Sequence, residues 1–136
     1  MNAVLVDTGF LVALFRRDDR LRGTARDYLE AHNHPLVTVA PVIVETCLFL
    51  DARGKVELLT WAERGGIDVV DIAPGAYPVI SAIILKYADR EIDFADAALV
   101  WHANDTRMRA VLTVDAKDFT AFRLQGGTRF DVIPWC

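Results

Sequence analysis

Four acidic residues stand alone within apolar segments of the sequence. Asp7 is the only ionisable residue between positions 3 and 15, and Glu45 is the only acidic residue between positions 36 and 50. Asp96 has apolar neighbours throughout segment 94–101, and Asp115 directly follows the mostly apolar segment 110–114. Burying an ionised carboxylate is costly unless a cation or several hydrogen-bond donors meet it. Four such acids are therefore better explained by one shared divalent cation than by four separate buried sites.

Carboxylate oxygens favour Mg²⁺ or Mn²⁺ over zinc, so this set could hold a metal ion that activates water and polarises a bound substrate. The histidines give little support to a metal-free mechanism. His32 and His34 lie in a polar turn and His102 lies late in a predicted helix, and we interpret all three as surface residues. The two cysteines, Cys47 and Cys136, indicate neither a disulfide framework nor a zinc site.

Alternating strands and helices must position these acids. Apolar or alternating runs typical of strands occur at 3–6, 36–39, 67–72, 110–114 and 130–133. Helical spacing predicts helices near 8–15, 21–31, 41–53, 56–64, 76–88 and 93–103. This alternation predicts an α/β fold of three layers, α/β/α, with a central, mostly parallel sheet, in a single domain covering residues 1–136.

The predicted elements bring the acids toward one edge of the sheet. Asp7 and Asp115 end buried strands, so both are expected at the carboxyl-terminal edge, and Asp96 lies in the first turn of a helix that could face that edge. Glu45 lies mid-helix with only Thr46 polar nearby, which argues against a solvated helix face. Asp96 could also be a first-turn acid favoured by the helix dipole, and Asp115 a turn residue.

Two further acids have simpler interpretations. Asp93 precedes a predicted helix, and we interpret it as the N-cap of that helix. Asp118 we interpret as a loop acid. Neither residue alone would indicate a metal site.

Composition restricts the classes of partner. Hydrophobic residues make up 53% of the chain, but no stretch approaches the roughly 20 apolar residues that a membrane-spanning helix needs, and the start of the chain has no signal-like segment. We therefore expect a cytoplasmic protein that does not bind membranes. The net charge of −4 argues against broad nonspecific coating of nucleic acid. We interpret the one basic concentration as a solvated helix face, formed by Arg16, Arg17, Arg20, Arg22 and Arg26.

The ordered set of motifs resembles a PIN domain across essentially the whole chain. These motifs are Val6-Asp7-Thr8, Glu45, Asp93-Phe94-Ala95-Asp96, and Leu112-Thr113-Val114-Asp115 followed by Asp118-Phe119. Within that superfamily the chain most resembles the VapC toxins of bacterial and archaeal toxin–antitoxin pairs.

The resemblance implies that Asp7, Glu45, Asp96 and Asp115 are the catalytic and metal-binding acids. Thr8 and Thr113 would orient a water molecule, while Asp93 and Asp118 match less consistently. The resemblance also implies an RNA substrate, hydrolysis that depends on Mg²⁺ or Mn²⁺, a homodimer and a small antitoxin partner.

Three other functions are compatible with parts of this pattern. Housekeeping PIN nucleases use the same acids without an antitoxin. A phosphatase could use Asp7 as a covalent nucleophile, but the haloacid-dehalogenase pattern requires a second aspartate where this chain has Gly9, and no lysine ends a later strand. A non-catalytic interaction module with a decayed site would not be expected to keep the complete acid set.

Overall fold

Five parallel strands form a central sheet within residues 2–136, the part of the chain that the computed structural model describes. The strands lie in the order β3-β2-β1-β4-β5, and every neighbouring pair runs parallel. Their bounds are β1 (Val4–Val6), β2 (Leu36–Val39), β3 (Asp68–Val70), β4 (Ala110–Leu112) and β5 (Asp131–Val132). The predicted parallel sheet is confirmed, although most strands are shorter than the runs that predicted them.

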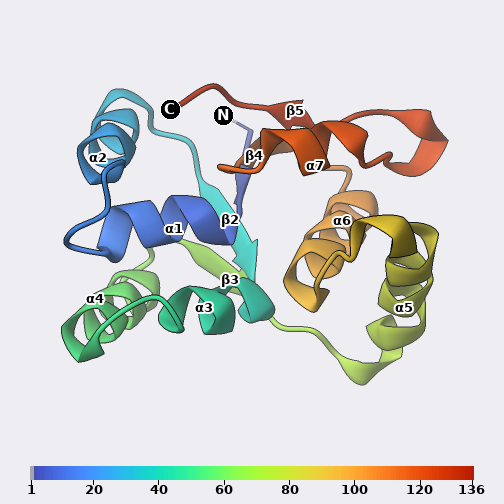
Figure 1. Ribbon diagram of the computed structural model, residues 1–136, viewed down its shortest axis with the longest axis horizontal. Helices are drawn as coiled ribbons and strands as arrows, with labels where there is room; N and C mark the ends of the chain where they lie inside the picture. The colour runs from blue at the N-terminus through green and yellow to red at the C-terminus, as the bar shows by residue number, and fades with distance from the viewer. Residues whose placement is uncertain (1) are drawn as a thin grey trace.

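Helices cover both faces of this sheet, which confirms the predicted three-layer α/β/α arrangement (Figure 1). In Figure 1, α1, α2 and α4 lie to the left of the strands and α5 and α6 to the right. The helices are α1 (Thr8–Phe15), α2 (Arg22–Ala31), α3 (Ala40–Cys47), α4 (Ala52–Glu63), α5 (Tyr77–Lys86), α6 (Phe94–Thr106) and α7 (Ala116–Ala121). Short 3₁₀ turns occur at η1 (Pro74–Ala76), η2 (Ala88–Arg90) and η3 (Gln125–Gly127). Over residues 2–136, none of the helices has both the length and the apolar character needed to cross a membrane.

Strand β1 occupies the centre of the sheet and sets the position of the first acid. Leu5 is fully buried and pairs with Val37 on one side and Val111 on the other. The backbone N–H of Asp7 donates to the carbonyl of Leu112 at 2.9 Å, so hydrogen bonding between these segments continues one residue beyond β1. Asp7 is thereby held beside the end of β4.

The predicted helix over 41–53 is wrong in its extent, because α3 ends at Cys47 and α4 begins at Ala52. Asp51 marks the start of the second helix, since its side-chain oxygen accepts a hydrogen bond from the backbone N–H of Gly54 at 2.8 Å and caps α4. A capping aspartate satisfies a backbone donor that a continuous helix would have paired internally.

Three local predictions are also corrected. Asp118 is not in a loop but in the first turn of α7, which the sequence pattern did not predict. His102 is buried rather than on the surface, and burial lowers its pKa. The basic residues do not share one helix face, because α2 begins only at Arg22 and the first three arginines precede it.

Candidate active site

A cavity of about 450 Å³ lies at the carboxyl-terminal edge of β1 and β4. Six acids line it. Five of them come from four segments that are far apart in the sequence, Asp7, Glu45, Asp93, Asp96 and Asp115, and the sixth is Asp19. Its other lining residues are Thr8, Gly9, Val12, Arg20, Leu21, Phe49 and Val114. Of the eight residues singled out from the sequence, only Thr113 and Asp118 are outside this lining.

Asp7 lies at the base of the cavity and is held by two donors. Its Oδ1 accepts from the backbone N–H of Thr8 at 2.8 Å, which caps α1, and its Oδ2 accepts from the Thr113 hydroxyl at 2.8 Å. Only 6% of Asp7 is exposed. Desolvation therefore raises its pKa from 3.8 to about 6, although both hydrogen bonds favour the ionised form.

Thr113 connects Asp7 to Asp115 and does not face the cavity. Its hydroxyl donates to Asp7 and accepts from the backbone N–H of Asp115 at 2.9 Å. Through these two hydrogen bonds the buried Thr113 hydroxyl orients the Asp7 carboxylate. The expectation that Thr113 also orients a water molecule stays a prediction.

Asp115 lines the cavity from the start of α7. Its Oδ1 accepts from the backbone N–H of Asp118 at 3.4 Å, so it also caps that helix. Partial burial, followed by the nearby Asp118 carboxylate, raises the pKa of Asp115, and Arg90 opposes the shift. Asp118 lies behind Asp115 and forms an ion pair with Arg90 at 3.1 Å.

Glu45 reaches the cavity from the last turns of α3. Desolvation and, after it, the neighbouring Asp93 raise the pKa of Glu45 from 4.5 to about 7. The nearby Thr8 hydroxyl lowers the pKa of Glu45 and so opposes this shift. The two side chains nevertheless do not form a hydrogen bond. Thr8 Oγ1 is buried and has no hydrogen-bond partner within residues 2–136. A buried hydroxyl without a partner is uncommon and indicates a group that could serve a ligand.

Asp93 and Asp96 lie together at the start of α6. Asp93 Oδ1 accepts from the backbone N–H of Asp96 at 2.8 Å, as expected of the N-cap that the sequence indicated. The same residue also lines the cavity. The pKa of Asp96 rises from 3.8 to about 8 because the residue is largely desolvated and Asp7, Asp93, Glu45 and Asp115 surround it.

The acids repel one another, and within the described residues none of the five forms an ion pair with a basic side chain. Three of them, Asp7, Asp93 and Asp115, cap helices, so the amino-terminal ends of α1, α6 and α7 meet near the cavity. The partial positive charge at helix amino termini stabilises carboxylates placed there. This arrangement offsets part of the repulsion without any basic side chain.

The donor set is suited to a hard divalent cation. All potential ligands are carboxylate or hydroxyl oxygens, and burial together with the neighbouring carboxylates raises the pKa of Asp7, Glu45 and Asp96. However, over residues 2–136 no three histidine, cysteine, aspartate or glutamate side chains are arranged so that they could hold a metal ion as they stand. The acids therefore share a cavity without forming a ready-made coordination sphere.

The sequence analysis did not identify several lining residues. Gly9 is required for close packing, because a Cβ at this position would overlap the side chain of Val114. Phe49 and Arg20 reach the cavity from two inter-helix connections, and no local pattern could have placed them there. A second, mostly apolar cavity of about 620 Å³ adjoins the first and shares Glu45 and Asp93 with it.

Comparison with known proteins agrees with this architecture. Ribonuclease VapC26 of Mycobacterium tuberculosis is 29% identical over 135 residues, which span 96% of this chain and 100% of that protein. The crystal structure of Mycobacterium tuberculosis VapC20, described as a sarcin-ricin loop cleaving toxin, matches with a TM-score of 0.72 at 20% identity and covers 79% of this chain and 86% of that one.

A toxin–antitoxin complex from Klebsiella pneumoniae contains a chain that matches with a TM-score of 0.67 at 20% identity, over 98% of both chains. These two superpositions support the three-layer fold. The family itself is shown by sequence, since residues 4–123 match the PIN domain. The resemblance predicted from the ordered acids is thus confirmed, and the chain belongs to the PIN domain family.

Proposed function

We propose that this protein is an endoribonuclease that hydrolyses RNA with Mg²⁺ or Mn²⁺, and that it is the toxin of a toxin–antitoxin pair. One observation carries the proposal: acids from four distant segments line a single cavity and have no basic partners among the described residues. The similarity to Ribonuclease VapC26 over nearly the whole chain supports RNA as the substrate.

In this proposal Asp7, Asp96 and Asp115 hold the ion and Glu45 completes the site. Binding requires these side chains to turn toward a common point, and the cavity of about 450 Å³ leaves room for that movement. The Thr113 hydroxyl holds the Asp7 carboxylate in place through a hydrogen bond. Asp93 caps the start of α6, the turn that carries Asp96. The unpartnered Thr8 hydroxyl is available to the attacking water or to a phosphate oxygen.

When bound, the ion supplies Lewis-acid polarisation of the phosphate and activation of the attacking water. The chain's own part is to orient that water in line with the scissile bond and to exclude other nucleophiles. Water attacks phosphorus and the 3′-oxygen leaves with a proton, which gives a 3′-hydroxyl and a 5′-phosphate. A metal-free ribonuclease that uses the 2′-hydroxyl would leave a cyclic phosphate or a 3′-phosphate.

The direct test is cleavage of RNA by wild type in Mg²⁺, Mn²⁺ or EDTA, compared with Asp96→Asn. We expect cleavage only with a divalent ion, and a loss of at least roughly a hundredfold in the variant, since it removes a metal-binding carboxylate. Asp105→Asn is the matched control, because Asp105 is an exposed acid on the same helix outside the cavity. Full activity in EDTA, or a cyclic-phosphate product, would overturn the mechanism.

Assignment as a toxin adds two partners, an antitoxin that covers the acid cavity and a second copy of the chain. The expected result is that expression of the protein alone arrests growth, whereas Asp96→Asn expression does not. A short neighbouring reading frame should restore growth when expressed with the protein. Robust growth with active wild type would instead support a housekeeping PIN nuclease.

A further inference from the structure

Arg20 is the one basic residue that lines the acid cavity within the described part of the chain. It lies in the connection between α1 and α2, at the opposite end of α1 from Asp7. Helix α1 has eight residues, and at about 1.5 Å per residue its two ends are roughly 12 Å apart. The cavity therefore extends along α1 from the acids to a single positive charge.

The connection that carries Arg20 is held in place by Asp19. The Asp19 carboxylate accepts from the backbone N–H of Leu21 at 2.9 Å, and its carbonyl accepts from the backbone N–H of Arg22 at 3.1 Å. Because these hydrogen bonds flank Arg20 in the sequence, its backbone is fixed. The Asp19 side chain is already engaged as an acceptor in this turn.

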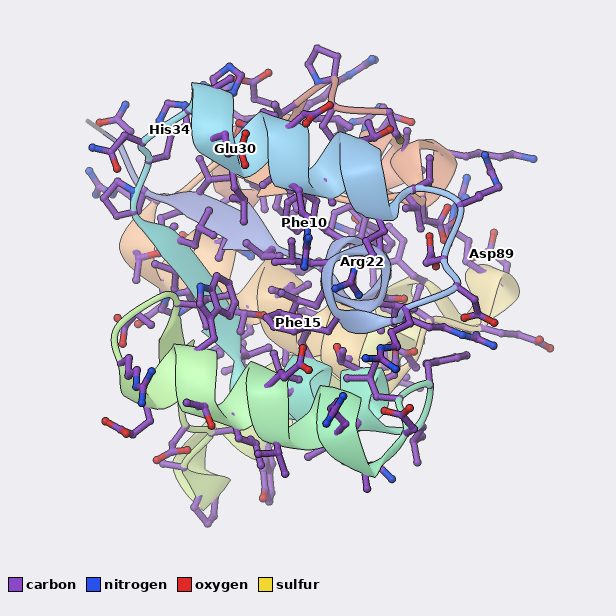
Figure 2. The ribbon with its side chains drawn as sticks, turned by 90° about the vertical axis from the view of Figure 1, so that its left-hand side faces the viewer. Phe10, Phe15, Arg22, Glu30, His34 and Asp89 are labelled. Carbon is purple, nitrogen blue, oxygen red and sulfur yellow. The ribbon has the colours of Figure 1, made fainter. Side chains whose placement is uncertain are left out.

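Arg20 differs from the neighbouring arginines in lining the cavity, and it has no partner within residues 2–136. Arg16 pairs with Asp18 at 3.0 Å, whereas Arg20 makes no ion pair or side-chain hydrogen bond to any residue in 2–136. Figure 2 shows Arg22 lying over the end of α1, and this residue does not line the cavity. An exposed guanidinium near several carboxylates, yet bonded to none of them, remains available for an external anion.

The negative charge of the cavity explains why RNA binding would need a cationic side chain. Six carboxylates, including Asp19, line the cavity and would repel an RNA backbone. An ion at the acids offsets that repulsion at the scissile phosphate only. A phosphate farther along the strand needs its own positive partner, and guanidinium groups bind phosphate through two parallel hydrogen bonds.

We propose that Arg20 binds a backbone phosphate of the RNA substrate on the α1–α2 side of the scissile bond. The inference rests on the proposed ribonuclease function and extends it by giving the path of the strand along α1. Arg20 is a substrate-binding residue in this scheme and takes no part in bond cleavage. Its loss should weaken RNA binding while leaving the chemical step intact.

The test compares Arg20→Ala and Arg20→Lys with Arg17→Ala, on a single-stranded RNA that wild type cleaves. Arg17 is a matched control because it is an exposed arginine of the same connection that does not line the cavity. We expect Arg20→Ala to raise KM roughly tenfold with little change in kcat, the equivalent of one charge-assisted hydrogen bond. Arg20→Lys should recover most of the loss, and Arg17→Ala should match wild type.

A second measurement separates phosphate binding from a general electrostatic effect. RNA affinity is measured against salt concentration in the uncleaving Asp96→Asn background, with and without Arg20→Ala. Loss of one phosphate contact should reduce the slope of log Kd against log salt by about 0.7. If Arg20 only offsets the acids, its removal would change metal affinity while KM and this slope stay the same, and the inference would be wrong.

Failure of this inference differs from failure of the proposed function. If wild type cleaves RNA and Arg20→Ala behaves like Arg17→Ala in both KM and salt slope, only the role of Arg20 is overturned. If wild type cleaves no RNA with either divalent ion, the ribonuclease assignment fails and the role of Arg20 fails with it.

Discussion

Thr113 donates its hydroxyl hydrogen to Asp7 Oδ2 at 2.8 Å, and both residues are buried. We expect Thr113→Val to lower the free energy of unfolding by about 1–2 kcal/mol, because it leaves Asp7 Oδ2 without a donor and the backbone N–H of Asp115 without an acceptor. Loss of this donor also raises the pKa of Asp7, so RNA cleavage should need more Mg²⁺ than in wild type. Urea unfolding and a Mg²⁺ titration of activity measure the two effects.

Thr113→Ser is the control for this experiment, since it keeps the hydroxyl and should retain most of both properties. Equal stability and equal Mg²⁺ requirement in Thr113→Val and wild type would show that the hydrogen bond has no part in positioning Asp7.

The metal-free protein should become less stable as the pH rises. Asp7, Glu45 and Asp96 have folded-state pKa values of about 6, 7 and 8, against 3.8, 4.5 and 3.8 for the ordinary groups. At a pH between the ordinary and the folded-state pKa values, the folded state binds more protons than the unfolded state. The free energy of unfolding therefore falls as the pH rises through this range. Urea unfolding in EDTA should show a clear drop from about pH 5 to about pH 8.

The Asp96→Asn substitution and added Mg²⁺, both measured at about pH 8, test the cause of this loss of stability. Asp96→Asn should stabilise the metal-free protein there, since it removes a carboxylate that its neighbours repel, and Mg²⁺ should stabilise wild type more than the variant. A pH profile that is flat in EDTA, or steeper in Asp96→Asn, would contradict mutual repulsion among the acids.

Gly9 should be necessary for activity even though it lies in a helix. Alanine favours helices over glycine by about 1 kcal/mol, so Gly9→Ala need not destabilise the fold. Its Cβ would overlap the side chain of Val114, the residue before Asp115, and we expect Asp115 to be displaced and the rate of RNA cleavage to fall.

The double variant Gly9→Ala/Val114→Ala tests that explanation. Removing the Val114 side chain clears the overlap, so cleavage should recover toward the rate of Val114→Ala alone. A double variant as impaired as Gly9→Ala would show that the glycine acts in some other way.

Asp51 offers a contrast between a structural acid and the acids of the cavity. Asp51→Ala removes the N-cap of α4 and should lower the free energy of unfolding by about 1 kcal/mol. Because Asp51 does not line the cavity, kcat and KM for RNA should stay within about twofold of wild type, the range expected for a substitution remote from the site. Loss of activity without loss of stability would place Asp51 in the site after all.

The sheet and the main acids could be predicted because each leaves a local pattern. Strand β1 is a continuous apolar run, and Asp7 and Glu45 are isolated charges within apolar segments. The break after Cys47 left no such pattern, since Leu48-Phe49-Leu50 continues the apolar run although Leu48 is 79% exposed. Apolar composition alone could not show that Leu48 and Phe49 are exposed while Leu50 stays in the core.

The remaining features depend on how distant segments meet. Arg20 reaches the cavity only because the α1–α2 connection folds back along α1. Helix α7 has six residues, too few for a helical period to be recognised in the sequence. The role of Thr113 depends on its hydrogen bond to a residue 106 positions away.

The capping aspartates link loss of activity to the local folding of three helices. Asp7, Asp93 and Asp115 each start a helix, so alanine at any of them removes an N-cap as well as a carboxylate. Asparagine and serine are uncharged residues that still cap helices well. Natural copies of this chain that had given up cleavage but stayed folded should therefore carry asparagine or serine at these positions more often than alanine.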